Sequence, residues 1–142
     1  VGALDLLPER LRTRLLDAAA EPLAAPQQLT LCVAISYGGR EEVARTARAI
    51  GTRVAAGELL PEQIDEALVT ATMRASEHSV PSDPDLLIRT GGDLRLSNFL
   101  LYQCAYTELL CLDCLWPDFC DAHLAKALEE FARRRRNFGG RV

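Results

Sequence analysis

Two arginines and a serine lie close together in the sequence, around a pair of glycines. Arg89 follows an apolar run at residues 86–88, and Arg95 and Ser97 follow the glycine pair. Guanidinium groups bind phosphate oxygens through forked pairs of hydrogen bonds. Two of them beside a hydroxyl indicate a ligand with more charge than one carboxylate. We therefore predict that Arg89, Arg95 and Ser97 bind a diphosphate, and a role in surface salt bridges is the alternative.

The residues around this cluster predict a strand, a tight turn and a helix. The apolar run 86–88 is typical of a buried strand, and Gly91 and Gly92 allow the backbone to turn. Ser97 precedes an apolar-periodic segment, so its hydroxyl is expected to cap a helix from residue 97 to about residue 108. The unpaired N–H groups of a helix start favour an anion, and ligands of open parallel sheets bind beyond the carboxyl ends of the strands.

The remaining sequence alternates between helical and strand-like patterns. Near-continuous hydrophobicity at residues 29–35 is typical of a parallel strand that is buried on both faces. The expected strands cover 29–35, 86–88 and 109–112, and the expected helices cover 4–20, 41–56, 61–76, 97–108 and 121–136. This alternation predicts an α/β fold with a largely parallel sheet flanked by helices, as a single domain over residues 1–142. In the last helix we expect Leu124, Leu128 and Phe131 to face inward.

The composition limits the classes of function. With 49% hydrophobic and 25% charged residues, the 142-residue chain resembles a soluble globular protein. Its net charge of -4 argues against a general nucleic-acid binder, and no apolar run approaches the ~20 residues of a membrane span. Five cysteines and the absence of a leader pattern at Val1 predict a reducing, cytoplasmic location.

Two segments resemble a known family. The stretch IRTGGDLRLSNFLLYQCAY, followed by ELL and LWPDF, resembles the C-terminal motif of the cis-prenyltransferases, the undecaprenyl diphosphate synthase family. Residues 37–40, YGGR, resemble an earlier element of that family, and the likeness runs from about Leu4 to Gly140.

The resemblance implies an enzyme that condenses isopentenyl diphosphate with an allylic diphosphate to make a (Z)-prenyl or (Z)-polyprenyl diphosphate. Arg89, Arg95 and Ser97 match the positions that hold the diphosphate of isopentenyl diphosphate, and Glu108 matches a magnesium-linked glutamate. Arg40 follows a double glycine and is expected to face the same site, although a salt bridge with a neighbouring glutamate is an alternative. The lipid product also implies contact with a membrane surface.

Glu108 raises a geometric difficulty. If the segment from Ser97 to Glu108 is helical, its eleven steps span roughly 16 Å at about 1.5 Å per residue. Glu108 then cannot easily share Mg²⁺ with the anion site of its own chain. The family forms dimers, so we expect a homodimer in which Glu108 serves the partner's site.

Other parts of the family pattern are missing. No stretch matches the N-terminal aspartate–glycine–asparagine element that holds the allylic diphosphate, and Val1 is not expected to be the native start. The chain therefore resembles the C-terminal portion of the enzyme, and we expect these 142 residues to be inactive alone. Asp93 stands where the family usually has glutamate, and Leu94 where many members have histidine.

Two other functions remain open. One is a non-catalytic partner subunit of the same fold, although such subunits tend to lose the diphosphate motif that this chain keeps. The other is a small zinc-binding interaction module, suggested by the spacing of Cys111, Cys114, Cys120 and His123. The apolar run that contains the first two cysteines argues against zinc.

Overall fold

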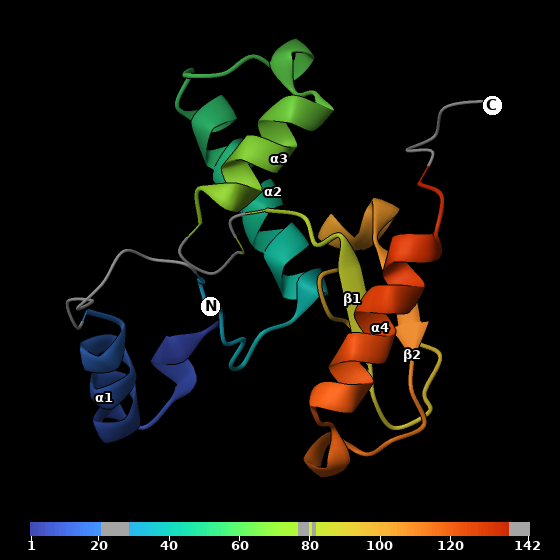
Figure 1. The fold of residues 1–142 in the computed structure, drawn as a ribbon. Coiled ribbons are helices and arrows are strands. Elements are labelled where there is room, and N and C mark those ends of the chain that lie inside the picture. The colour runs from blue at the N-terminus through green and yellow to red at the C-terminus, as the bar shows by residue number, and fades with distance from the viewer. Residues whose placement is uncertain (21–28, 77–79, 81, 137–142) are drawn as a thin grey trace. The chain divides into compact units, whose positions relative to one another are not determined.

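The computed structural model of the protein describes residues 1–20, 29–76, 80 and 82–136. It consists of two compact units, Val1–Pro81 and Ser82–Val142. The first unit is helical and the second contains the sheet (Figure 1). Whether the two units act as one domain, as the sequence predicts, stays a prediction.

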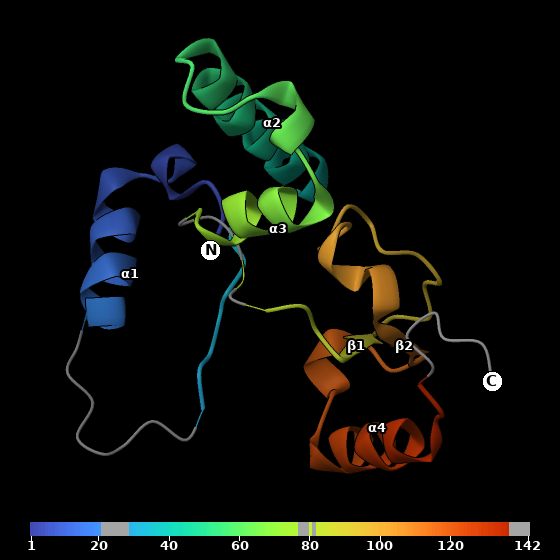
Figure 2. The same ribbon diagram turned by 90° about the horizontal axis from the view of Figure 1, so that it is seen from above.

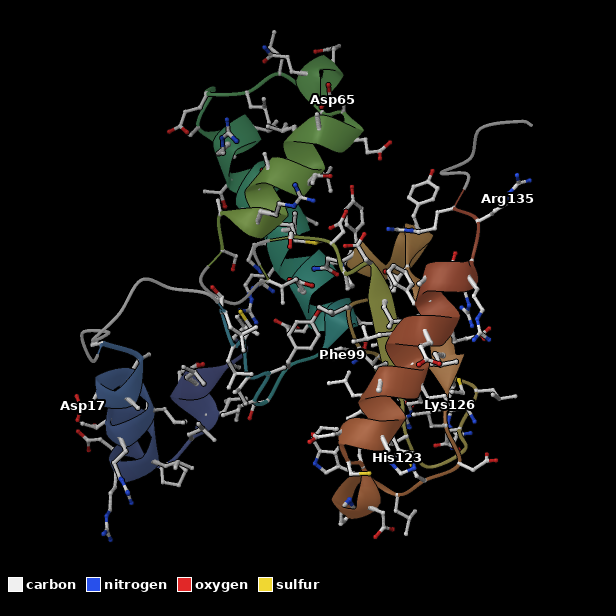
Figure 3. The ribbon with its side chains drawn as sticks, in the orientation of Figure 1. Asp17, Asp65, Phe99, His123, Lys126 and Arg135 are labelled. Atoms are coloured by element: carbon white, nitrogen blue, oxygen red, sulfur yellow. The ribbon has the colours of Figure 1, made fainter. Side chains whose placement is uncertain are left out.

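In the first unit, two helices pack against each other. The elements are η1 (Leu4–Leu6), α1 (Glu9–Ala20), α2 (Gly39–Ala55), η2 (Pro61–Gln63) and α3 (Glu66–Arg74). Helices α2 and α3 are in contact, and Ile50, Leu59 and Met73 are buried apolar side chains among the described residues of this unit. Asp65, labelled in Figure 3, accepts a hydrogen bond from the Leu68 N–H at 2.8 Å and so fixes the start of α3.

The helices predicted in this unit are present, but two of them are divided. The segment predicted as one helix over 4–20 contains a short 3-10 turn and then α1, and Pro8 lies between them. The segment 61–76 likewise divides into η2 and α3, because the cap at Asp65 begins a new helix. Within the described residues, no helix is both long and apolar enough to cross a membrane.

The prediction of a strand over residues 29–35 is wrong for the chain as described. These residues form no strand, and Leu29 and Leu31 are 84% and 81% exposed. The Val1 backbone donates to the Val33 carbonyl at 2.8 Å and accepts from the Ile35 N–H at 2.9 Å. A parallel strand needs sustained backbone pairing along its edges. The pairing described here extends over only a few residues, so no ladder forms.

In the second unit, two parallel strands form a sheet with helical segments on both faces. Strands β1 (Leu86–Arg89) and β2 (Glu108–Cys111) pair in the register Leu86↔Glu108 to Arg89↔Cys111. Helix α4 (Asp121–Arg133) covers one face of this sheet, and η3 (Gln103–Tyr106) lies on the other (Figures 1 and 2). The α/β class and the parallel sheet are thereby confirmed. A further 3-10 turn, η4 (Trp116–Asp118), leads into α4.

The inward face of α4 is narrower than the sequence predicts. Ala127 is fully buried, whereas Leu124 and Leu128 are 42% and 52% exposed, so the prediction that both leucines face inward is wrong. Phe131 is partly buried, and the Arg136 guanidinium lies 5.6 Å from the centre of its ring.

Candidate functional site

A tight turn follows β1, as the glycine pair predicts. Gly91 and Gly92 have φ values of 85° and 73°, in the left-handed region that glycine adopts without strain. Their N–H groups donate to the carbonyls of Cys114 and Leu112 at 2.8 and 3.0 Å. The turn is therefore anchored to the segment that follows β2, next to the carboxyl end of the sheet.

One carboxylate joins the two arginines of the motif. Asp93 accepts from Arg89 Nη2 through Oδ2 at 3.0 Å, and its Oδ1 lies 2.8 Å from Arg95 Nη2. The Arg89 side chain is 34% exposed and the Arg95 side chain is 69% exposed. The structure thus brings the two predicted arginines together. The resemblance marked Asp93 only as a replacement for the family's usual glutamate, and its place four residues after one arginine and two before another was the available signal of this pairing.

The arginine pair lines a pocket with an apolar wall. The pocket has a volume of about 360 Å³, and Leu87, Leu96 and Phe99 line it together with Arg89 and Arg95. A smaller pocket of about 220 Å³ shares both arginines and is otherwise lined mainly by leucines. Cations beside apolar walls suit a ligand with an anionic head and a hydrocarbon tail.

Ser97 does not begin a helix, so that prediction is wrong. Ser97, Asn98 and Leu100 have φ values of 50°, 66° and 44°, which a right-handed helix excludes. The first helical turn is the 3-10 segment Gln103–Tyr106, and the residues of this stretch include many weak helix formers. Burial of Leu100 and Gln103, at 6% and 4% exposure, fixes the chain in a turn instead.

Ser97 lies outside the pockets of the arginine pair. Ser97 is exposed and lines neither pocket of the arginine pair. A helix start therefore contributes no N–H groups here, and the two guanidiniums are the cationic part of the site. Ser97 as a diphosphate ligand remains a prediction from the resemblance.

Glu108 lies at the opposite end of the sheet from the arginine pair. It is the first residue of β2 and pairs with Leu86, whereas Arg89 pairs with Cys111. Three residues of strand correspond to about 10 Å. Glu108 is therefore separated from the arginine pair, as predicted, but the register of the two strands produces the separation and not a helix from Ser97 to Glu108.

The environment of Glu108 allows a test of the predicted Mg²⁺. Its Oε2 accepts from Arg134 Nη1 at 2.9 Å, and Arg134 also donates to the Leu109 carbonyl at 2.9 Å. In the described part of the chain, no group of three or more His, Cys, Asp or Glu side chains could hold a metal ion. Mg²⁺ is often bound by one or two carboxylates with phosphates and water as further ligands. Glu108 fits as such a single protein ligand if Arg134 releases it.

The four residues of the predicted zinc alternative do not form a metal site. Cys120 Sγ lies 3.3 Å from His123 Nδ1, at the start of α4, where Figure 3 labels His123. Cys111 lies in β2, and all four residues belong to the part that the structure describes, where no group of three ligands occurs. The geometry therefore gives no support to a zinc-binding module.

Arg40 belongs to the other compact unit. It lies in the first turn of α2 and is exposed, directly after Gly38 and Gly39. Its neighbour Glu42 accepts a hydrogen bond from the Tyr37 hydroxyl at 2.6 Å. A role for Arg40 in binding the same ligand as Arg89 stays a prediction.

The second unit is thus an α/β structure in which a parallel strand ends beside two arginines and a pocket that is partly lined by apolar side chains. Residues 1–139 match the prenyltransferase family described as undecaprenyl diphosphate synthase. The chain belongs to this family. Its membership confirms the resemblance that the motif around Arg89 predicts.

The chain spans about half the length of the relatives that it matches, and the matches cover most of this chain. A (2E,6E)-farnesyl-diphosphate-specific ditrans,polycis-undecaprenyl-diphosphate synthase of Xanthomonas campestris is 52% identical over 123 residues, which are 86% of this chain and 46% of that protein. An isoprenyl transferase of Geobacillus kaustophilus is 42% identical over 140 residues, 99% of this chain and 53% of that protein.

Solved structures show the same likeness. Lavandulyl diphosphate synthase from Lavandula x intermedia, in complex with dimethylallyl diphosphate, is 37% identical with a TM-score of 0.85, over 98% of this chain and 58% of that one. A probable undecaprenyl diphosphate synthase from Campylobacter jejuni has a TM-score of 0.75 at 32% identity, over 98% of this chain and 61% of that one.

Proposed function

We propose that the protein is a cis-prenyltransferase that condenses isopentenyl diphosphate with an allylic diphosphate to make a (Z)-prenyl or (Z)-polyprenyl diphosphate. The observation that carries this proposal is the joined pair Arg89 and Arg95, which lines a pocket with apolar side chains at the carboxyl end of β1. Family membership supplies the reaction type.

Within this proposal, the arginine pair binds the diphosphate of isopentenyl diphosphate, and Ser97 and Arg40 are its further predicted ligands. The two guanidiniums offset the charge of the diphosphate and orient it. Leu96 and Phe99 offer the apolar surface against which the five-carbon tail lies. Together they keep water away from the reacting carbons.

Glu108 serves a second role, as the predicted ligand of Mg²⁺ in the site of the partner subunit of a homodimer. Bound Mg²⁺ offsets negative charge on a diphosphate leaving group. The separation of Glu108 from Arg89 along the sheet supports this arrangement, because the two residues lie at opposite ends of the strands in one chain.

The cellular setting follows from the chemistry. All five cysteines are free, which suits a reducing cytoplasm, and the lipid product brings the protein to a membrane surface. The 142 residues have no match to the family's aspartate–glycine–asparagine element, so we expect them to be inactive alone.

The direct test uses protein expressed from its complete gene, with isopentenyl diphosphate, farnesyl diphosphate and Mg²⁺. Radiolabel from isopentenyl diphosphate should enter an extractable lipid, and Arg89→Ala and Arg95→Ala should each reduce the rate at least about 100-fold. Arg48→Ala, in α2, is the matched control and should leave the rate unchanged. Lack of incorporation by a folded wild-type protein would contradict the proposal.

The same assay tests the alternative of a non-catalytic partner subunit. Such a subunit makes no product by itself but raises the rate of a catalytic prenyltransferase mixed with it. Retention of both arginines in a joined, pocket-lining arrangement favours the enzyme.

A further inference from the structure

We propose that Asp93 is a positioning residue for the diphosphate site: its carboxylate holds Arg89 and Arg95 together so that both guanidiniums face one ligand. This inference rests on the proposed function, because it deals with the same arginine pair. It assigns a role to a residue that lines neither pocket of the arginine pair.

The first observation is the division of the Asp93 carboxylate. Oδ2 pairs with Arg89 at 3.0 Å and Oδ1 with Arg95 at 2.8 Å, so each oxygen serves one guanidinium. Two arginines repel each other, and Arg95 is 69% exposed on a loop. Without a shared anion, solvent would separate the two side chains, and each would have to be ordered again when a ligand binds.

The second observation is that Asp93 lies outside the two pockets. Both arginines line the 360 Å³ and the 220 Å³ pocket, but Asp93 lines neither. The carboxylate therefore holds the guanidiniums from outside the volume that a ligand would fill. A carboxylate that competed with the ligand would instead occupy the pocket.

The third observation is spare hydrogen-bonding capacity on Arg89. Asp93 takes one Nη2 hydrogen bond from this arginine, and a guanidinium has five N–H donors. Within the described residues, the Arg89 Nε is buried and has no hydrogen-bond partner. The pairing with Asp93 thus orients Arg89 and leaves donors for a phosphate.

The direction in which Asp93→Asn changes the affinity for diphosphate distinguishes a positioning role from a purely electrostatic effect. Removal of any nearby negative charge should tighten the binding of an anion. Asp93→Asn removes one, yet it should weaken the binding of inorganic diphosphate by about five- to twentyfold, because two arginines lose their order. Titration calorimetry of the purified protein with inorganic diphosphate measures this change.

Asp113 provides a matched control. It lies beside the same turn: a Cβ atom added to Gly92 would be 3.4 Å from its Oδ1. Among the described residues, no arginine pairs with Asp113. Asp113→Asn should leave the dissociation constant of diphosphate unchanged or slightly lower. Asp93→Glu keeps a carboxylate at this position, so its dissociation constant for diphosphate should lie within about threefold of the wild-type value.

The steady-state constants KM and kcat give a second measurement, because an unfolded variant would lose kcat whereas a loss of positioning mainly raises KM. Asp93→Asn should raise KM for isopentenyl diphosphate by a similar factor and change kcat less than about twofold. If thermal unfolding shows that this variant is not folded, Asp93→Ser replaces it with the same expectation.

Unchanged or tighter diphosphate binding by Asp93→Asn would overturn the positioning role, while a loss of binding by Arg89→Ala and Arg95→Ala would keep the site. If those two arginine variants bind diphosphate as well as wild type does, the arginine pair is not the diphosphate site. The positioning role of Asp93 is then contradicted as well.

Discussion

Glu108 and Arg89 lie at opposite ends of the two-stranded sheet, because Glu108 pairs with Leu86 and Arg89 pairs with Cys111. The distance along the strands is about 10 Å, which separates the predicted metal ligand from the arginine pair of its own chain. Under the proposed function, we therefore expect a homodimer in which the Glu108 of one chain serves the arginine pair of its partner.

This relationship predicts complementation between inactive subunits. Co-expression of Glu108→Ala chains with Arg95→Ala chains should restore about one quarter of the wild-type activity. Half of randomly formed dimers are mixed, and each mixed dimer has one intact site. The measurement is the rate per mole of dimer, with each variant expressed alone as the control. Activity no greater than the sum of the two parents would show that Glu108 does not act across the interface.

Arg134 pairs with Glu108, the predicted ligand of Mg²⁺. Its Nη1 lies 2.9 Å from Glu108 Oε2, and both side chains are 27% exposed. Arg134→Gln removes this competing cation, so half-maximal activity should need about two- to fivefold less Mg²⁺. A magnesium titration of the initial rate measures the change.

Arg133 is the control for this experiment. Its side chain is 75% exposed and pairs with Glu129 only at 3.9 Å, so Arg133→Gln should leave the magnesium requirement unchanged. An equal shift in both variants would point to a general loss of positive charge. No shift in Arg134→Gln would contradict the competition.

The cap at Asp65 makes a measurable contribution to stability. Asp65 Oδ1 accepts from the Leu68 N–H at 2.8 Å at the start of α3. Asp65→Ala should lower the free energy of unfolding by about 1 kcal/mol, as measured by urea denaturation. Glu62→Ala, an exposed acid that caps no helix, should change it by less than about 0.5 kcal/mol. Equal losses in both variants would argue against the cap.

Cys104 should be slow to react with alkylating reagents. Burial raises the pKa of its thiol, the hydrogen bond with Thr107 lowers it, and the negative charge of Asp83 raises it, with a net upward shift. The reactive thiolate is therefore scarce at pH 8. In single-cysteine variants, iodoacetamide should modify Cys104 more slowly than the exposed Cys32 and Cys120.

The same shift gives a pH dependence of stability. Because the folded-state pKa is raised, the native state keeps its proton where the unfolded chain loses it. The contribution of Cys104 to stability is complete below the ordinary thiol pKa. It disappears as pH rises through the folded value. Cys104→Ser should therefore show a smaller loss of stability between pH 8 and pH 10 than wild type, and an equal loss would contradict the shift.

The sequence predicted the parts whose local pattern is strong. The apolar runs at β1 and β2, the glycine turn and the long amphipathic segments of α2 and α4 each form where the pattern places them. Such elements depend on their own residues and on the burial of one face. The family motif around Arg89 also lies within one short stretch, so it can be read without the fold.

The helix predicted at Ser97 and the strand predicted at residues 29–35 depend on contacts that the sequence does not specify. The first stretch has weak helix propensity, and burial of Leu100 and Gln103 selects a turn instead. The second stretch has the composition of a strand, but a strand exists only where neighbours pair with its backbone.

What the sequence determined is the inventory of the site: two arginines beside a glycine turn, and an acid farther along the chain. Only the tertiary structure decided that Asp93 joins the arginines, that both line a pocket with apolar side chains, and that Glu108 lies at the far end of the sheet. The reason is that residue types and short spacings are written in the chain. Strand register and side-chain direction arise from packing between segments that are distant in it.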